Sequence, residues 1–368
     1  MTAVFRNRAP RRNEDIAVLH LPEWREANPY LDNLAEALRS LGVRVLFPSD
    51  LSRPVFSRRS IRSVDLVHLH WPEVYLEASS RLGILLRAFR LVLFLEWSRR
   101  TGVGLVWTAH NLGAHEPRWP VVQRWTHCYI ARKAACIVVH YPAAGELLGE
   151  WLGVEGLAIE VIDHPAFPTP NEPTTLSTSR RRLGLDQDAP VVLYLGSIRR
   201  YKNTARLMDA FRLSAPGNGR LILAGWVSDS SLEKEIERIA SDDDRIRTML
   251  QFIPEDQVPD LMAAADVVAV PHTSGLTRGS AVLAMSYGKA VIGSNCPHLR
   301  YLLGSDQSDL LFNPEDTEDM ARVISLALAD SQRLATVGAR NRQRILKTSW
   351  DDAGRQLSRI YKTILSRS

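Results

Sequence analysis

A loop rich in small residues joins an apolar strand to a short helix within residues 266–288. The apolar run Asp266–Val270 predicts a buried parallel strand, and Ser280–Tyr287 predicts a helix that ends at Gly288. This order of strand, loop and helix points free backbone N–H groups and the positive helix end at one spot. Such a spot favours a phosphate group, although an ordinary strand-to-helix turn has the same pattern.

Three residues of this loop suit a phosphate site. Ser280 is a good N-cap residue for the predicted helix. Gly275 and Gly279 carry no side chain, so a ligand can approach the backbone closely at both positions.

A second stretch, GSIRRYKN at Gly196–Asn203, places three cations where another predicted strand ends: Arg199, Arg200 and Lys202. In a parallel sheet this edge lies near the loop before Ser280. Cations that face a helix N-terminus hold a diphosphate well and offset the charge that grows on a leaving nucleoside diphosphate. A transferase that uses a nucleotide-activated sugar needs this arrangement, and we expect it to work without a metal ion.

Histidines mark the N-terminal half of the chain. His68 and His70 are two residues apart at the end of the predicted strand Asp65–His70, so they share one face. Open α/β sheets bind ligands at the carboxyl ends of their strands. A zinc pair is conceivable, but no third ligand lies at a convincing spacing. Substrate contact and structural hydrogen bonding are the other interpretations.

More polar residues follow other strands of this half: His20, His110, Asp163 and His164. Because the carboxyl ends of parallel strands meet at one edge, we expect these side chains to converge on a polar rim that could hold a sugar.

The order of predicted elements indicates an α/β fold with two doubly wound, Rossmann-like domains. A length of 368 residues also favours two domains. The segment Pro165–Arg182 is rich in Pro, Thr and Ser and is the best linker candidate. The predicted strands are Ile16–His20, Val43–Phe47, Asp65–His70, Gly104–Thr108, Ala135–His140 and Ala158–Ile162 before it, and Val191–Leu195, Arg220–Ala224, Gln251–Ile253, Asp266–Val270 and Ala290–Ser294 after it.

Taken together, these motifs resemble the GT-B glycosyltransferases, in particular the family 4-like group. GSIRRYKN matches that family's Gly–x5–Lys phosphate loop, with Lys202 at the lysine position, and GSAVLAMSYGKAVI matches its donor-binding helix. The resemblance implies an acceptor-binding domain at 1–168, completed by a crossover helix at 350–368. It also implies a nucleotide-sugar-binding domain at 175–349, facing the first across a cleft.

The resemblance also implies roles for single residues. We expect the diphosphate to be bound, beside the cations, by Thr277, Gly279 and Ser280. We expect the base to be bound by Phe252, Ile253 and Pro254. The resemblance casts His110 and His164 as acceptor or donor-sugar contacts. We also expect sugar or acceptor contacts at His68, His70, Asn111, Asp163, Ser274 and Gly275.

The sequence departs from the family at two points. An arginine commonly follows the first glycine of the phosphate loop, where this chain has Ser197. The family's paired glutamates fall on Gly275 and Leu283, as in a bacterial subgroup that lacks both. Sugar and ribose recognition are therefore unassigned, and a retaining mechanism is less well supported.

The expected reaction moves a hexose from a GDP- or UDP-sugar to a glycan or lipid-linked acceptor. An inverting reaction needs a general base, for which Glu73, His110 and Glu116 are the candidates; a retaining reaction needs none. A nucleotide-sugar 2-epimerase and a nucleotide-sugar-binding pseudoenzyme are the alternatives. The first would need carboxylates that move a proton, and the second is suggested by the missing glutamates.

Charge and hydrophobicity indicate where the protein acts. A net charge of +5 suits an anionic partner; we expect nucleotide phosphate rather than nucleic acid. Three scattered cysteines and the absence of an apolar segment near the start favour the cytoplasm. The helix Arg81–Arg100 is unusually apolar. It could be buried against the sheet, or it could lie peripherally on the inner membrane face with its arginines near anionic headgroups.

Overall fold

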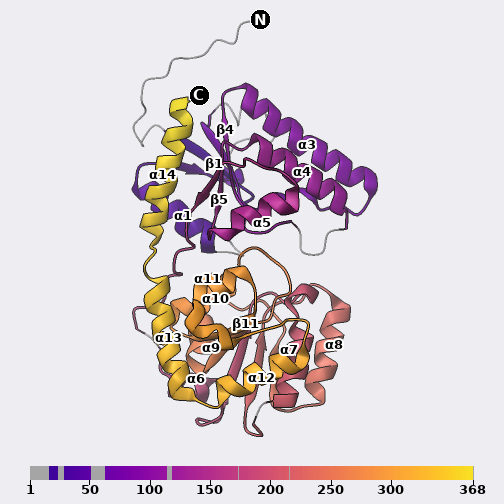
Figure 1. Ribbon diagram of the computed structural model, residues 1–368, viewed down its shortest axis with the longest axis vertical. Helices are drawn as coiled ribbons and strands as arrows, with labels where there is room; N and C mark the ends of the chain where they lie inside the picture. The colour runs from indigo at the N-terminus through magenta and orange to yellow at the C-terminus, as the bar shows by residue number, and fades with distance from the viewer. Residues whose placement is uncertain are drawn as a thin grey trace, which may run out of the picture. The chain divides into compact units, whose positions relative to one another are not determined.

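The computed structural model describes residues 16–23, 29–50, 63–113, 118–172, 174–214 and 216–367 (Figure 1). The chain forms two compact units. The N-terminal unit comprises residues 1–164 and 348–368, and the C-terminal unit comprises residues 165–347. The predicted domain boundaries lie close to these limits.

The N-terminal unit is built around a parallel sheet of six strands, in the order β2-β1-β3-β4-β5-β6. The order departs from the sequence because the chain winds first to one side of β1 and then to the other, as in doubly wound folds. The strands are β1 (Ala17–Leu21), β2 (Arg44–Leu46), β3 (Leu66–Leu69), β4 (Gly104–Thr108), β5 (Cys136–Val139) and β6 (Ile159–Val161).

Helices cover both faces of this sheet. They are α1 (Pro29–Ser40), α3 (Arg81–Arg100), α4 (Pro120–Lys133), α5 (Ala143–Leu152) and α14 (Trp350–Arg367), with 3-10 turns at Pro48–Asp50 and Pro72–Leu76. The last helix, α14, is at the C-terminal end of the chain, yet it packs beside α1 of the N-terminal unit, as Figure 1 shows in yellow. Its apolar side chains, among them Leu357 and Tyr361, are buried in the core with residues of β1 and β3. Residues Trp350–Arg367 are thus a helix of the N-terminal unit, although they follow the C-terminal unit in the sequence.

The C-terminal unit repeats the pattern with a second parallel sheet, in the order β12-β11-β10-β7-β8-β9. Its strands are β7 (Val191–Leu195), β8 (Arg220–Ala224), β9 (Ile246–Met249), β10 (Val267–Val270), β11 (Ala290–Ser294) and β12 (Leu311–Phe312). Its helices are α6 (Leu176–Arg182), α7 (Thr204–Ser214), α8 (Ser230–Ser241), α9 (Val258–Ala264), α10 (Gly279–Ser286), α11 (Pro297–Leu303), α12 (Thr317–Leu328) and α13 (Ser331–Ile345), with 3-10 turns at Arg200–Lys202 and Ser305–Leu310.

Two predictions for this unit were wrong. The expected linker Pro165–Arg182 contains the helix α6, which packs on α9. Within α6, the buried Arg180 forms an ion pair with Asp266 at 2.8 Å. The expected strand Gln251–Ile253 is a loop, because β9 occupies the preceding residues Ile246–Met249 and pairs with β8.

Candidate functional site

At the start of the GSIRRYKN stretch, directly after β7, the backbone of Gly196 lies very close to that of Gly225. A Cβ atom at Gly225 would lie 1.9 Å from the carbonyl oxygen of Gly196, so only glycine fits there. Lys202 follows in the 3-10 turn, and its Nζ atom would lie 3.6 Å from a Cβ atom placed on Gly196. The ammonium group is therefore folded back over the backbone at the carboxyl end of β7.

The loop after β10 is fastened to this turn. The backbone N–H and the side-chain hydroxyl of Thr273 both donate to the carbonyl oxygen of Tyr201, at 2.9 Å and 3.0 Å. Strands β7 and β10 are neighbours in the sheet. The predicted meeting of the GSIRRYKN turn with the loop that leads into α10 is thus present within one unit.

The first turn of α10 presents polar groups that lack partners. The helix begins at Gly279 with Arg278 at the N-cap, so the expectation that Ser280 is the N-cap was wrong. Among the described residues, the buried hydroxyls of Thr277 and Ser280 have no hydrogen-bond partner. No atom lies within 4 Å of a Cβ atom placed on Gly279. Two buried hydroxyls without partners among the described residues therefore flank the helix N-terminus, and the space beside Gly279 is open.

Three cations gather at this place. Lys202 is partly buried, and this burial, with the nearby charges of Arg199 and Arg278, lowers its pKa to about 8. Arg199 is partly exposed, and its side chain has no ion-pair or hydrogen-bond partner among the described residues. Like charges repel unless an anion lies between them, so the arrangement suits an anionic ligand.

Arg278 is a site residue that the sequence interpretation missed. Its side chain is only 3% exposed and donates to the carbonyl oxygen of Gly275. Its backbone N–H donates to His298 Nδ1 at 3.1 Å, and its Nε atom is buried without a partner among the described residues. One signal was visible in the sequence, because Arg278 is the only Lys or Arg between β10 and α10.

Arg200 does not join this group. Its guanidinium binds Asp229, Glu235 and Ser231, at the start of α8 and in its first turns. The expectation that Arg200 binds diphosphate is therefore not supported by its position, since its charge is already paired. Arg199 and Arg278 provide the cations beside Lys202 instead.

The residues expected at the nucleotide base and sugar lie on two other loops of this unit. Phe252, Ile253 and Pro254 follow β9, and the Phe252 side chain is 61% exposed. An exposed aromatic ring can stack on a base. Ser274 and Gly275 follow β10, and the positive φ of +119° at Gly275 suits glycine.

In the N-terminal unit, six histidines form a contiguous cluster, which we call the imidazole group: His20, His68, His70, His110, His140 and His164. The Tyr30 ring lies against four of them, from His70 to His164, at centroid distances of 4.7–5.9 Å. The predicted convergence of histidines at the strand ends is therefore present.

Burial lowers the pKa of five histidines of this group: His20, His68, His70, His110 and His140. It lowers the pKa of His20 to about 3 and that of His140 to about 4. Burial also holds the pKa of His68, His70 and His110 well below the usual value, and the neighbouring histidines add to the effect. The lowered pKa makes the His110 ring a weak general base, and a ring that stays unprotonated supplies no positive charge.

The structure separates these histidines into rim and interior. His110 and His164 are 6% and 5% exposed, whereas His68 and His70 are 0% and 1% exposed. His68 lies 2.7 Å from both Tyr361 Oη and Thr108 Oγ1, so both of its ring nitrogens are occupied. The expectation that His68 and His70 contact a sugar is not supported by their position, because other side chains enclose both.

Glu73 lies beside the rim, in the 3-10 turn after β3. Its Oε1 atom accepts a hydrogen bond of 3.1 Å from Asn111 Nδ2, and its Oε2 atom lies 3.8 Å from His127 Nε2. Asp163 is partly exposed between β6 and His164. Glu116, the third candidate base, lies outside the described residues.

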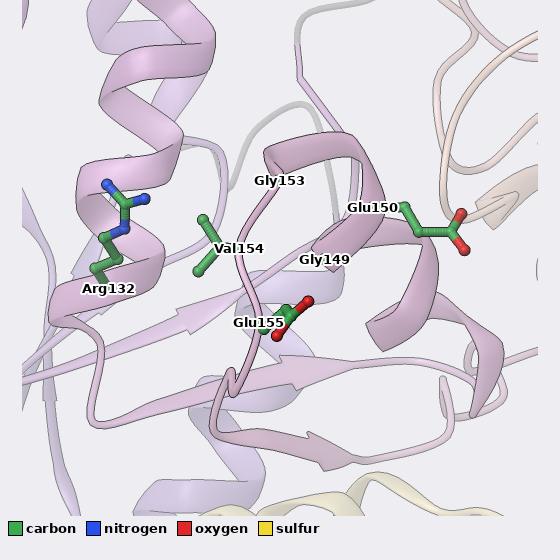
Figure 2. A pocket seen from close by; sticks show the side chains of 6 residues that line it. All are labelled: Arg132, Gly149, Glu150, Gly153, Val154 and Glu155. Atoms are coloured by element: carbon green, nitrogen blue, oxygen red, sulfur yellow. The ribbon is translucent and has the colours of Figure 1, made fainter.

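A separate hollow of about 630 Å³ lies in the N-terminal unit between α4 and α5 (Figure 2). It is lined by Arg132, Gly149, Glu150, Gly153, Val154 and Glu155. Figure 2 shows the Glu150 side chain directed away from Arg132. None of the lining residues carries the chemistry expected above, so we do not place the site there.

Comparison with known proteins agrees with this geometry. Residues 177–344 match the family described as "Glycosyl transferases group 1". That match covers most of the C-terminal unit, including the GSIRRYKN turn and the start of α10.

One curated relative and two solved structures extend the comparison to both units. A GDP-mannose:glycolipid 4-beta-D-mannosyltransferase from Xanthomonas campestris pv. campestris is 28% identical over 278 residues, which are 72% of this chain and 69% of the relative. The sucrose-phosphate synthase of Thermosynechococcus elongatus superposes with a TM-score of 0.74 at 19% identity, covering 96% of this chain and 100% of that one. Anabaena Alr3699/HepE in complex with UDP and glucose has a TM-score of 0.70 at 18% identity, with 94% and 99% covered.

Proposed function

We propose that this chain is a GT-B glycosyltransferase and that it moves a hexose from a GDP- or UDP-sugar to a glycan or lipid-linked acceptor. One observation carries the proposal. Lys202, Arg199 and Arg278 gather beside a helix N-terminus whose hydroxyls have no partner among the described residues. A diphosphate matches this set in both charge and number of acceptor oxygens.

On the donor side, each group has a distinct role. The unpartnered hydroxyls of Thr277 and Ser280 donate to phosphate oxygens, and the open space at Gly279 admits them to the backbone. Phe252 stacks on the base, since its ring is exposed beside the same sheet edge. Ser274 and Gly275 lie next to the sugar.

The cations also supply the catalytic electrostatics. As the bond from the sugar to the diphosphate breaks, negative charge grows on the leaving nucleoside diphosphate. Lys202, Arg199 and Arg278 stabilise that charge without reorganising, because packing and hydrogen bonds already hold this loop in place. Three cations are enough to replace a divalent ion at the diphosphate, so transfer proceeds without Mg²⁺ there.

On the acceptor side, Glu73 is the preferred general base of an inverting reaction. Its carboxylate is oriented by Asn111 and lies beside the rim, whereas the lowered pKa of His110 makes that ring a poor proton acceptor. His110, Asp163 and His164 then serve to bind the sugar hydroxyls. The name of the Xanthomonas relative, which acts on a glycolipid, supports a lipid-linked acceptor.

A lipid-linked acceptor would require contact with a membrane, and α3 has a suitable surface. Its side chains Leu82, Leu85, Leu86, Phe89 and Leu93 are all exposed and recur at helical spacing along one face. Exposed arginines, at 81, 87 and 90, lie among them. Apolar side chains flanked by arginines are typical of helices that lie in a membrane interface.

We therefore propose that α3 rests on the inner membrane face. No helix among the described residues is long and apolar enough to span a bilayer.

A thermal-shift screen against GDP, UDP, TDP and ADP tests the donor proposal. A ligand that binds only the folded chain stabilises it by about 2.7 kcal/mol at a concentration one hundred times its Kd. We expect one of GDP and UDP to raise the Tm clearly and ADP to do so least. A melting temperature that none of the four nucleotides changes would contradict the proposed donor site.

A further inference from the structure

Three of the buried histidines lie close enough together to share one ion. His20 is the last residue but one of β1, His68 lies on β3, and His70 directly follows β3. In the parallel pairing of the two strands, His20 lies directly beside His68. One nitrogen from each of the three rings lies within 4.8 Å of the other two, and all three residues are fully buried.

Protein groups do not satisfy these rings completely. His20 Nδ1 lies 3.0 Å from His70 Nε2, which accounts for one nitrogen of each ring. The other nitrogen of His20, Nε2, is buried and has no partner among the described residues. A buried polar nitrogen without a partner is costly, so the contact with His70 alone leaves the His20 ring incompletely satisfied.

We propose that His20, His68 and His70 form a binding site for one divalent transition-metal ion of the Zn²⁺ class. The donor set consists of three imidazoles, and no carboxylate or thiolate belongs to it among the described residues. Imidazole nitrogens suit Zn²⁺, Co²⁺, Ni²⁺ and Cu²⁺, whereas Mg²⁺ and Ca²⁺ prefer oxygen ligands. Imidazole binds a metal ion through a ring nitrogen in its neutral form.

The distances fit such an ion with little movement. Zn–N bonds of about 2.0–2.1 Å in a tetrahedral site place two ligand nitrogens about 3.3–3.4 Å apart. His20 Nδ1 and His70 Nε2, at 3.0 Å, need to separate only slightly. His70 then keeps its other nitrogen, Nδ1, toward His110 Nε2 at 3.3 Å, as metal-bound histidines usually keep an orienting partner.

His68 must exchange one hydrogen bond for the ion. Its Nδ1 faces Tyr361 Oη and its Nε2 faces Thr108 Oγ1. One of these hydroxyls stays as the orienting partner while the other nitrogen turns to the metal. Because Tyr361 belongs to α14, the ion would stabilise the packing of this helix against β1 and β3. The site is structural and is separate from the diphosphate cations, which lie in the other unit.

Metal analysis of the purified full chain tests the inference, using untagged protein so that no affinity tag binds the ion. After removal of metal with a chelator and dialysis against Zn²⁺, we expect about one ion per chain and a higher Tm. Dialysis against Co²⁺ should give the visible absorption of a tetrahedral nitrogen site. Binding well below one ion per chain overturns the inference, and so does a thiolate-to-cobalt charge-transfer band, which would place the ion on cysteines.

Two matched variants locate the ion. His68→Phe should lower bound Zn²⁺ from about one ion per chain to less than about a tenth of one. The control His127→Phe changes another fully buried histidine of the same unit, outside the imidazole group, and should keep the full ion. Equal metal content in both variants would contradict the site. If His68→Phe does not fold, X-ray absorption at the zinc edge of the wild-type protein decides, because only imidazole ligation agrees with the inference.

Discussion

Lys202 shows how one side chain can be both a binding group and a titrating group. Burial, assisted by the charges of Arg199 and Arg278, lowers its pKa to about 8. Near pH 7 about nine in ten of these ammonium groups are charged, and near pH 9 only about one in ten. The second ionisation of a phosphate group lies near pH 6, so the ligand keeps its charge over the same range.

Nucleoside diphosphate affinity should therefore fall as the pH rises from 7 to 9. The charged ammonium binds the anion and the neutral amine does not, so the loss should approach about tenfold, as expected for one charged hydrogen bond. Titration calorimetry at three pH values measures it. In Lys202→Arg the side chain stays charged and the curve should be flat. A variant that loses affinity as steeply as the wild type would show that another group titrates.

Residue types at strand ends were predictable from sequence, but the direction of each side chain was not. Arg199 and Arg200 are adjacent and chemically identical in the sequence. Only the fold shows that Arg200 forms ion pairs with Asp229 and Glu235, about thirty positions later in the sequence, and that its side chain is therefore held at α8. His20 and His70 are likewise brought together by strand pairing across fifty positions, so spacing alone gave no third metal ligand.

Among the elements, α3 carries the clearest functional prediction. The helix was predicted with its observed bounds. One face is buried, as the first interpretation expected, and the other exposes the apolar side chains that the proposed interfacial role requires. Phe89→Glu should weaken binding to vesicles of anionic phospholipid by about tenfold or more, since an apolar side chain is lost from the interface and a negative charge is added. Vesicle flotation measures the change.

A matched control exists in the other unit. Leu213 on α7 is 69% exposed, slightly more than the 59% of Phe89. Leu213→Glu should leave flotation unchanged, and neutral vesicles should bind the wild-type protein much less than anionic ones. Wild-type protein that fails to float with anionic vesicles, or equal losses in both variants, would rule out the α3 surface.

Other elements show where sequence patterns mislead. The segment of α6 is rich in Ser, Thr and Arg, so it looked like a linker, yet the Thr175 side chain caps the helix and buried Arg180 bonds to Asp266 and to the carbonyl oxygen of Ala264. Tertiary hydrogen bonds of this kind leave no periodic apolar signal. Strand β9 was misplaced because its residues Arg247 and Thr248 interrupt the apolar run that a strand prediction relies on.

For the whole molecule, the two-unit α/β architecture followed from the sequence because most buried parallel strands are short, continuous apolar runs. The six histidines of the imidazole group lie at, or within two residues of, the ends of five of the six predicted N-terminal strands, so the location of that rim was also predictable. Only the structure shows which hydrogen-bond partners each histidine ring has. The central claim remains that the cations of the C-terminal unit bind the donor diphosphate.

Titration calorimetry of the preferred nucleoside diphosphate against two neighbouring variants tests that claim most directly. Arg199 has no partner among the described residues, whereas Arg200 is paired with Asp229 and Glu235. Removing a charged hydrogen bond costs about 1.5–3 kcal/mol, so Arg199→Ala should weaken binding by about tenfold to a hundredfold. Arg200→Ala should change affinity by less than about twofold. Equal losses, or a larger loss in Arg200→Ala, would contradict the account.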